Sequence, residues 1–309
     1  MSKKCYVTMM FRLLMRQPLI WSRTELTESE TREKTKAIAE QVVPKRWRKS
    51  QPEEKEMTGP KLFGLVKSKC FDETGSHKCS KVGHACFRRV SSNMLLPWKA
   101  SWRTVGRAIQ ALLMDACLTW DTWSLKDALQ DIRGVVGRLR HHRLCEKCGC
   151  EKPPLVIATY DAAQAFENLE AEEAVRGLEM AADLWRKQRG GEGREGNIWV
   201  STSGRLEYST KKEACHYTEV SLEEAINAMK GALQLSEVKF GDTVWKQRGL
   251  PTGGMISRQA LSAALLPRER KWSIAEGGCE SHAWGACRYV DDNLMIASGL
   301  CEPCLEQKG

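Results

Sequence analysis

Two adjacent aspartates near the end of the chain, Asp291 and Asp292, are its most distinctive chemical feature. Short, largely apolar runs at 286–290 and 294–297 flank them and predict two β-strands, with the tight turn of a hairpin at Asp-Asp-Asn. Neighbouring carboxylates repel each other unless a cation neutralises them, and Mg²⁺ favours a few carboxylates together with phosphate oxygens. Taken alone, the pair fits a solvated acidic hairpin better than a metal site, so other segments must decide.

Two further segments bear on this choice. Residues 155–161 form an apolar run, predicted to be a strand, that ends in the carboxylate of Asp161. Residues 238–248 predict a hairpin that leads into a glycine-rich loop at 249–257. Glycines allow a backbone to approach a ligand closely, because they carry no Cβ. The chain therefore combines two acidic strand ends with a loop suited to close contact.

In this order, the three segments resemble the palm motifs of reverse transcriptases. Asp161 matches the first catalytic aspartate, and Gly249–Ser257 matches the substrate-binding loop. Tyr289–Asp292 matches the second carboxylate site, and the resemblance extends over residues 85–300 or so. It implies an α+β fold of the right-hand polymerase type, with fingers and a palm. The palm would be an antiparallel sheet with helices packed on one face.

The resemblance implies template-directed addition of deoxynucleotides to a primer 3′ end. Two Mg²⁺ ions about 3.5–4 Å apart would activate the attacking hydroxyl and neutralise the leaving pyrophosphate, and Mn²⁺ can substitute. Asp161 and Asp291 are expected to be the principal catalytic residues and metal ligands. Asp292 is expected to be an auxiliary carboxylate, and the carbonyl of Ala162 a further ligand. The implied partners are an RNA or DNA template with its primer, and dNTPs.

Phe166 and Arg88 are the expected contacts to the incoming nucleotide. Phe166 lies five positions after Asp161, where reverse transcriptases carry an aromatic that fills the space of a ribose 2′-hydroxyl. A hydroxyl buried there without a partner would cost about 1–3 kcal/mol, which favours dNTPs. Arg88 matches a fingers arginine that binds the triphosphate, since a guanidinium donates two hydrogen bonds to phosphate oxygens. A core phenylalanine and a surface arginine pair are the alternatives. The other residues expected at the nucleotide are Gly249, Pro251, Gly253, Ser257 and Tyr289.

Strands interleaved with helices must position these residues, which indicates the α+β class. Ser124 with Asp127, and Ser221 with Glu224, are capping signals that start two helices. Pro267 is expected to stop the helix that follows Ser257. The remaining expected elements are helices at about 98–117 and 171–187, a hairpin about 203–204 and a hairpin about 241–242.

Three regions are expected along the chain. Residues 1–60 would be a poorly ordered, basic and charged tail, residues 61–150 a fingers-like helical region, and residues 151–309 the palm. The sequence ends at Gly309, shortly after Asp292. The resemblance therefore implies a truncated polymerase that lacks the thumb and is inactive or non-processive.

Charge is distributed unevenly over the 309 residues. Residues 1–150 hold 29 Lys and Arg against 15 Asp and Glu, whereas residues 151–309 hold 19 against 24. A basic half joined to a half with clustered carboxylates suits an enzyme that grips a polyanion. No apolar run is long enough to span a membrane, so no membrane partner is expected. The expected location is intracellular, in the nucleus or cytoplasm rather than an organelle.

Thirteen irregularly spaced cysteines are read as reduced thiols. Cys145 with Cys148, and Cys301 with Cys304, have the spacing of zinc knuckles. The strand before Asp161 and the strand after Asp292 would bring the two pairs to one remote end of the palm. A structural Zn²⁺ site of four cysteines is therefore one hypothesis, and ordinary thiols are the alternative.

Two other functions stay open. An RNA-dependent RNA polymerase palm is the nearest, and Phe166 disfavours it because such enzymes tend to carry Asp at that position. The other is a non-catalytic, nucleic-acid-binding remnant of a retroelement.

Overall fold

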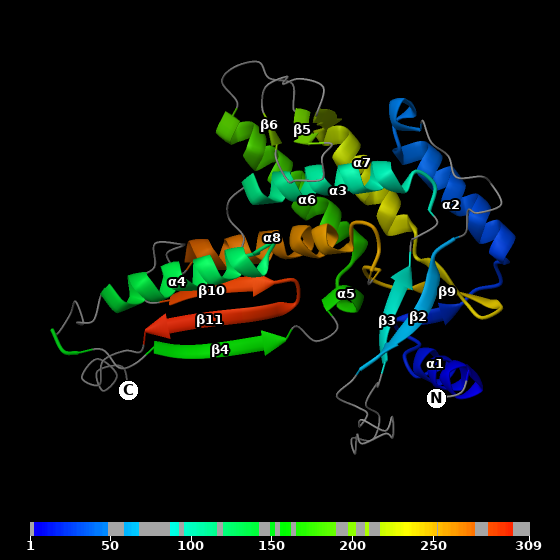
Figure 1. Cartoon of the computed structure of the whole chain (residues 1–309), viewed down its shortest axis with the longest axis horizontal. Coiled ribbons are helices and arrows are strands. Elements are labelled where there is room, and N and C mark those ends of the chain that lie inside the picture. The colour runs from blue at the N-terminus through cyan, green and yellow to red at the C-terminus, as the bar shows by residue number, and fades with distance from the viewer. Residues whose placement is uncertain are drawn as a thin grey trace. The chain divides into compact units, whose positions relative to one another are not determined.

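The computed structural model describes residues 3–48, 59–67, 87–92, 96–115, 120–141, 149–151, 155–161, 165–189, 197–201, 208–209, 217–251, 253–275 and 284–298. The chain divides into two compact units, and both mix helices with strands (Figure 1). Unit 1 comprises Met1–Ala116 and Phe166–Ala264, and unit 2 comprises Cys117–Ala165 and Leu265–Gly309. The α+β class is therefore confirmed. The division differs from the expected tail, fingers and palm, because each unit is assembled from two separate stretches of chain.

A mixed sheet forms one part of unit 1. Its strand order is β1-β9-β8-β2-β3, and only the β2–β8 pair is parallel. The strands are β1 (Trp21–Arg23), β2 (Lys61–Val66), β3 (Phe87–Ser92), β8 (Glu237–Phe240) and β9 (Thr243–Gln247). The hairpin expected about 241–242 is confirmed, since Phe240 pairs with Thr243 and Gly241 adopts a φ of 60°.

The region from 3 to 48 is not a poorly ordered tail. Helix α1 (Lys3–Met15) buries Met10 and Leu14 against Trp21, Phe87 and Trp245 of the sheet. Strand β1 pairs with β9, and Thr27 forms a capping box with Glu30 that starts α2 (Glu28–Val42), before the short helix η1 (Lys45–Trp47). Long-range burial and strand pairing, which the local charge pattern does not reveal, order this region.

Helices form the rest of unit 1, together with a small sheet. Helices α3 (Lys99–Asp115), α6 (Ala171–Arg189) and α7 (Leu222–Gln234) contact one another, and α2 contacts α7 (Figure 1). The sheet has the order β6-β5-β7, from β5 (Asn197–Ser201), β6 (Tyr208–Ser209) and β7 (Tyr217–Ser221). Ser221 accepts a hydrogen bond from the Glu224 amide at 3.0 Å, so the predicted start of α7 is confirmed.

Helix α8 (Ser257–Ala275) contains Pro267, so the expectation that this proline stops the helix is wrong. Proline has no N–H, so the usual helical bond to the carbonyl of Ala263 is absent, and the ring crowds that carbonyl. The Ala263 oxygen lies against α6 at Gly177, where an added Cβ would be only 1.7 Å away. A position without a side chain on α6 thus makes room for the Ala263 carbonyl of α8.

Unit 2 is built on the antiparallel sheet β10-β11-β4. Its strands are β4 (Leu155–Asp161), β10 (Trp284–Tyr289) and β11 (Asp292–Ser298). Helix α4 (Leu125–His141), whose predicted cap Ser124 accepts a hydrogen bond from the Asp127 amide at 3.1 Å, packs through Val135 and Leu139 on Ile296.

Helices contact both faces of strand β10, so the expectation of helices on one face is wrong for this sheet. A Cβ on Gly285 would meet Val135 of α4. The neighbouring Trp284 instead contacts Trp272 of α8, with ring centroids 4.2 Å apart. Successive residues of a strand face opposite sides, so each face of β10 has its own helix. No helix in the part of the chain that the structure describes has the length and apolar character needed to cross a bilayer.

Candidate active site

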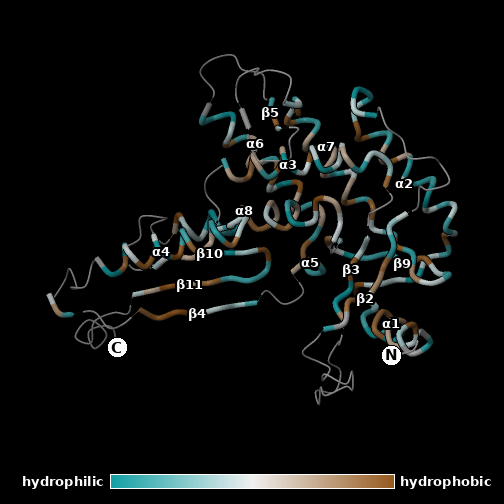
Figure 2. Tube along the Cα trace, viewed as in Figure 1, coloured by the Kyte–Doolittle hydropathy of each residue, from teal (hydrophilic) through white to brown (hydrophobic). Residues whose placement is uncertain are grey.

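The sheet of unit 2 brings the predicted carboxylates together. Strand β11 pairs with β4 in a register that sets Asp292 directly opposite Asp161, although the two lie far apart in sequence. Directly opposed residues of an antiparallel pair share one face, with Cβ atoms about 4.5–5.5 Å apart. Tyr289 is opposite Asp292 on the other side, so it belongs to the same face. Figure 2 shows β4 and β11 changing from brown to teal towards this end, which is the polar end of the sheet.

The turn comprises Val290 and Asp291, and not Asp291 to Asn293 as predicted. Tyr289 pairs with Asp292, so Val290 and Asp291 make the turn, and Asp292 and Asn293 are strand residues. Val290 has a φ of 62°, which β-branched residues rarely adopt. The Asn293 side chain donates to the Asp291 carbonyl at 3.0 Å. Asp291 is thus displayed at the hairpin tip, next to the opposed pair.

A buried arginine supports this turn from behind. The Arg288 side chain is 1% exposed, and its Nη1 donates to the Val290 carbonyl at 2.9 Å. Its Nε donates to Glu269 of α8 at 2.5 Å, and its Nη1 is 3.5 Å from an oxygen of Asp121. Burial lowers the pKa of Arg288, but the two carboxylates more than compensate and raise it. Burial raises the pKa of Glu269, and Arg288 opposes that shift. Sequence reasoning missed this cluster, and a charged residue inside a strand was its only local signal.

Asp161 and Asp292 face each other and offer two carboxylate ligands to a divalent cation, whereas Asp291 does not point at the same position. The side chains of Asp161 and Asp292 are exposed and that of Asp291 is half-buried. None of the three forms an ion pair within the described part of the chain. Two facing carboxylates fit a Mg²⁺ ion that keeps other positions for water and phosphate oxygens. In the same described residues, no three acidic, histidine or cysteine side chains converge on one metal position, so Asp291 would have to turn towards the pair.

Five predicted ligands lie outside the described residues. They are Ala162, Cys145, Cys148, Cys301 and Cys304. The carbonyl ligand and the zinc site therefore stay predictions.

In unit 1, the glycine loop gathers most of the residues expected at the nucleotide. Leu250 donates its amide to the Phe166 carbonyl at 2.6 Å. A Cβ on Gly249, whose φ is 84°, would lie 2.5 Å from the Glu167 carbonyl oxygen. The loop therefore needs glycine at this position to lie on the backbone of 166–167.

The other end of the loop is anchored by the strand β3 and by α8. A Cβ on Gly253, whose φ is 85°, would lie 2.9 Å from the Ser91 carbonyl oxygen. Ser257, at the start of α8, donates its hydroxyl to the Pro251 carbonyl. Phe166, Gly249, Pro251, Gly253 and Ser257 thus form one assembly in unit 1, whereas Asp161, Tyr289, Asp291 and Asp292 belong to unit 2.

Arg88 and its neighbour Arg89 differ in environment. Arg88 is exposed, and its guanidinium has no acidic partner in the described part of the chain. Arg89 forms an ion pair with Glu167 at 2.8 Å and also donates to Gln17. Burial lowers the pKa of Arg89, and Glu167 opposes that shift. Arg88 is therefore the one available to an anion, and Arg89 is a structural residue.

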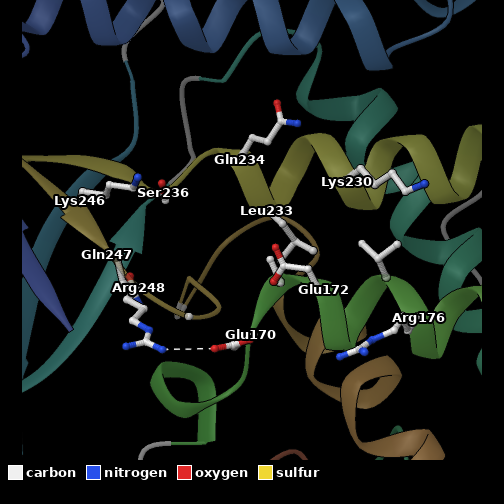
Figure 3. Close-up of a pocket in the computed structure, with 13 residues that line it drawn as sticks. Glu170, Glu172, Arg176, Lys230, Leu233, Gln234, Ser236, Lys246, Gln247 and Arg248 are labelled. Carbon is white, nitrogen blue, oxygen red and sulfur yellow. Dashed lines mark hydrogen bonds and ion pairs between the residues drawn. The ribbon is translucent and has the colours of Figure 1, made fainter. Parts of the chain in front are cut away.

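Unit 1 also contains a groove of about 1120 Å³ that the sequence did not reveal. It lies between the start of α6, the end of α7 and the end of β9 (Figure 3). Arg248 is paired with Glu170 at 3.2 Å, as the dashed line in Figure 3 shows, and Lys230 with Glu179 at 3.3 Å. The other cations that line it are Arg176 and Lys246, neither of which has an ion pair within the described residues.

The chain was compared with family models, curated sequences and solved structures, and only solved structures match. No family model matches the sequence. No curated protein sequence matches it either. Among solved structures, telomerase from Candida tropicalis in complex with the TWJ fragment of telomeric RNA has a TM-score of 0.53 and 12% identity, over 97% of this chain and 41% of that one. Apo telomerase from Candida tropicalis has a TM-score of 0.50 and 14% identity, over 93% and 47%.

The chain spans less than half the length of these two telomerases. At such low identity, the likeness concerns the fold alone. The chain therefore has an α+β fold that resembles part of telomerase.

Proposed function

We propose that this chain is a reverse-transcriptase domain that adds deoxynucleotides to a primer 3′ end on an RNA or DNA template. The observation that carries the proposal is the register of β11 on β4, which sets Asp292 opposite Asp161 beside the tip residue Asp291. Divalent ions held by these carboxylates would supply charge neutralisation at the attacking and leaving oxygens. The likeness to telomerase supports a polymerase-type fold.

The chain's own residues would bind and orient the substrates. Asp161, Asp291 and Asp292 would hold Mg²⁺, and Arg88 would bind the triphosphate through its two-donor guanidinium. The loop from Gly249 to Ser257 would lie close to the nucleotide, because its glycines carry no side chain. Phe166 would exclude a ribose 2′-hydroxyl.

Primer extension tests this proposal. The purified chain, with a primed RNA template, dNTPs and Mg²⁺, is expected to extend the primer, at least by one nucleotide. Asp161→Asn is expected to abolish extension, whereas Asp242→Asn, which changes an exposed aspartate in the β8–β9 turn, leaves it unchanged. Equal extension by the parent chain and Asp161→Asn would contradict the assignment.

Nucleotide choice separates this proposal from an RNA polymerase. With Phe166 in place, dNTPs are expected to be incorporated in preference to NTPs. Phe166→Ala is expected to relax that preference, because it opens space for the 2′-hydroxyl. A preference for NTPs in the parent chain would favour the RNA-dependent RNA polymerase instead.

A nucleic-acid-binding protein without catalysis is the second candidate. The basic first half of the chain favours it, together with Arg176 and Lys246 in the groove, which form no ion pair with any residue that the structure describes. For single strands, each phosphate contact contributes about −0.7 to the slope of log binding constant against log salt concentration. Neutralising Arg176 and Lys246 should therefore make this slope measurably less steep. Salt-dependent RNA binding that persists in Asp291→Asn, with no extension by the parent chain, would support this candidate over the enzyme.

A structural Zn²⁺ ion is proposed for the four cysteines Cys145, Cys148, Cys301 and Cys304. Thiolates in paired Cys-x-x-Cys segments are favoured zinc ligands. Zinc measured on the purified parent chain and on Cys301→Ser is expected to differ by about one ion per chain. Equal zinc in both proteins would reject the site.

A further inference from the structure

Arg288 joins three parts of unit 2 that are distant in sequence. Its side chain links Glu269 of α8, Asp121 in the segment before α4, and the Val290 carbonyl of the turn. Its backbone is held as well, since its amide donates to the Trp120 carbonyl at 2.6 Å and its carbonyl accepts from the Thr122 amide at 2.8 Å. Arg288 is therefore fixed on its main chain and on its side chain alike.

The turn that Arg288 contacts is one that needs support. Val290 has a positive φ of 62°, a conformation that opposes the preference of a β-branched residue. Such backbones persist where surrounding contacts hold them. The Val290 carbonyl accepts from Arg288 at 2.9 Å, so this bond acts directly on the strained peptide. The next residue along the chain is Asp291.

We infer that Arg288 is a positioning residue that holds the Val290–Asp291 turn, and through it the placement of Asp291 relative to the Asp161–Asp292 pair. The guanidinium is suited to this task because its planar fork donates in several directions at once, which an ammonium group cannot reproduce. The catalytic consequence rests on the proposed function. The structural part of the inference does not.

The test compares Arg288→Lys with a matched control, Cys287→Ala. Cys287 is the preceding residue of β10, is also buried, and faces the opposite side of the sheet, away from Glu269. In Arg288→Lys, Mn²⁺ affinity measured by electron paramagnetic resonance is expected to fall about 10–100-fold, as for other residues that orient metal ligands. The kcat of primer extension is expected to fall similarly, with the KM for dNTP unchanged. In Cys287→Ala both are expected to match the parent chain.

Hydrogen exchange provides a readout that does not need activity. The amides of 289–293 are expected to exchange faster in Arg288→Lys than in Cys287→Ala. Adding Val290→Gly to Arg288→Lys is expected to slow them again, because glycine adopts a positive φ without support. Should Arg288→Lys fail to fold, Glu269→Gln keeps the shape of the cluster, and a smaller acceleration at the same amides is expected.

The outcomes separate the two proposals. A parent chain that neither binds Mn²⁺ nor extends a primer refutes the proposed function, and hydrogen exchange then decides the role of Arg288. Equal exchange at 289–293 in the lysine variant and the control, or in Glu269→Gln and the parent chain if the lysine variant is unfolded, overturns the inference. A loss of Mn²⁺ affinity that is as large in Cys287→Ala also overturns it, because the effect would then reflect general destabilisation.

Discussion

Replacing Asp161 by asparagine is expected to stabilise the metal-free protein while removing its response to Mg²⁺. Asp161 and Asp292 are directly opposed and exposed, so their charges repel each other through a largely aqueous medium. Two unit charges about 5 Å apart at the dielectric constant of water interact by about 0.8 kcal/mol. Since exposed pairs are further screened, the expected gain in the free energy of unfolding is about 0.5 kcal/mol at low ionic strength, and less at high salt.

Mg²⁺ is expected to reverse the order of stability. A ligand that binds only the folded state stabilises it by about 2.7 kcal/mol at 100 times its dissociation constant. The parent chain should gain this amount, and Asp161→Asn much less, because one of the two facing carboxylates is gone. Urea unfolding followed by tryptophan fluorescence, with chelator and then with Mg²⁺, measures both free energies.

Asp242→Asn provides the comparison, because Asp242 is exposed in a turn and has no facing carboxylate among the described residues. It is expected to alter neither the metal-free stability nor the Mg²⁺ response. If Asp161→Asn destabilised the metal-free protein, or if Mg²⁺ stabilised it as much as the parent chain, the reasoning from the β4–β11 register would be refuted.

Three further predictions concern buried or constrained positions. Burial raises the pKa of Glu269, so its contribution to stability should be complete below about pH 4.5 and fall as the pH rises through the folded-state pKa. The urea midpoint should therefore vary less with pH in Glu269→Gln than in the parent chain. Identical pH profiles for the two proteins would contradict this. Gly249 and Gly241 both have a positive φ, so replacing either by alanine should lower the free energy of unfolding by about 1–2 kcal/mol. Gly249→Ala should lose more in urea unfolding, because only at Gly249 would the new Cβ have backbone atoms within 4 Å. Equal losses would contradict the packing argument. Burial raises the pKa of the Cys287 thiol, so iodoacetamide should label Cys287 slowly until the protein unfolds, and rapid native labelling would count against it.

Elements defined by local chemistry could be predicted from the sequence. The starts of α4 and α7 follow from a serine with an acidic residue three positions later, and the structure contains both capping bonds. The strand ending at Asp161 follows from its apolar run, and the β8–β9 hairpin from Gly241 at its turn. The predicted strand end at Asp161 and hairpin tip at Asp291 are brought together by the register of unit 2, although Asp292, expected in the turn, is a strand residue.

Features that depend on distant contacts could not be predicted. The charged surface of the region from 3 to 48 hides the burial of Met10 and Leu14 against the sheet. The position of the hairpin turn depends on Arg288, whose partners Glu269 and Asp121 are remote in sequence. Met10 and Leu14 have the i, i+4 spacing of one helix face, but this spacing does not identify the sheet that covers it, and a charged residue in a strand does not identify its partners.

The close approach of Gly177 to the Ala263 carbonyl restricts which residues position 177 can accept. Pro267 removes the amide that would otherwise hold this oxygen inside its own helix, and a bare backbone on α6 accommodates the result. A methyl group at 177 would lie only 2.5 Å from the carbonyl carbon of Ala263, so it would force the backbones of α6 and α8 apart. Libraries that vary position 177 should therefore recover folded variants almost only with glycine there.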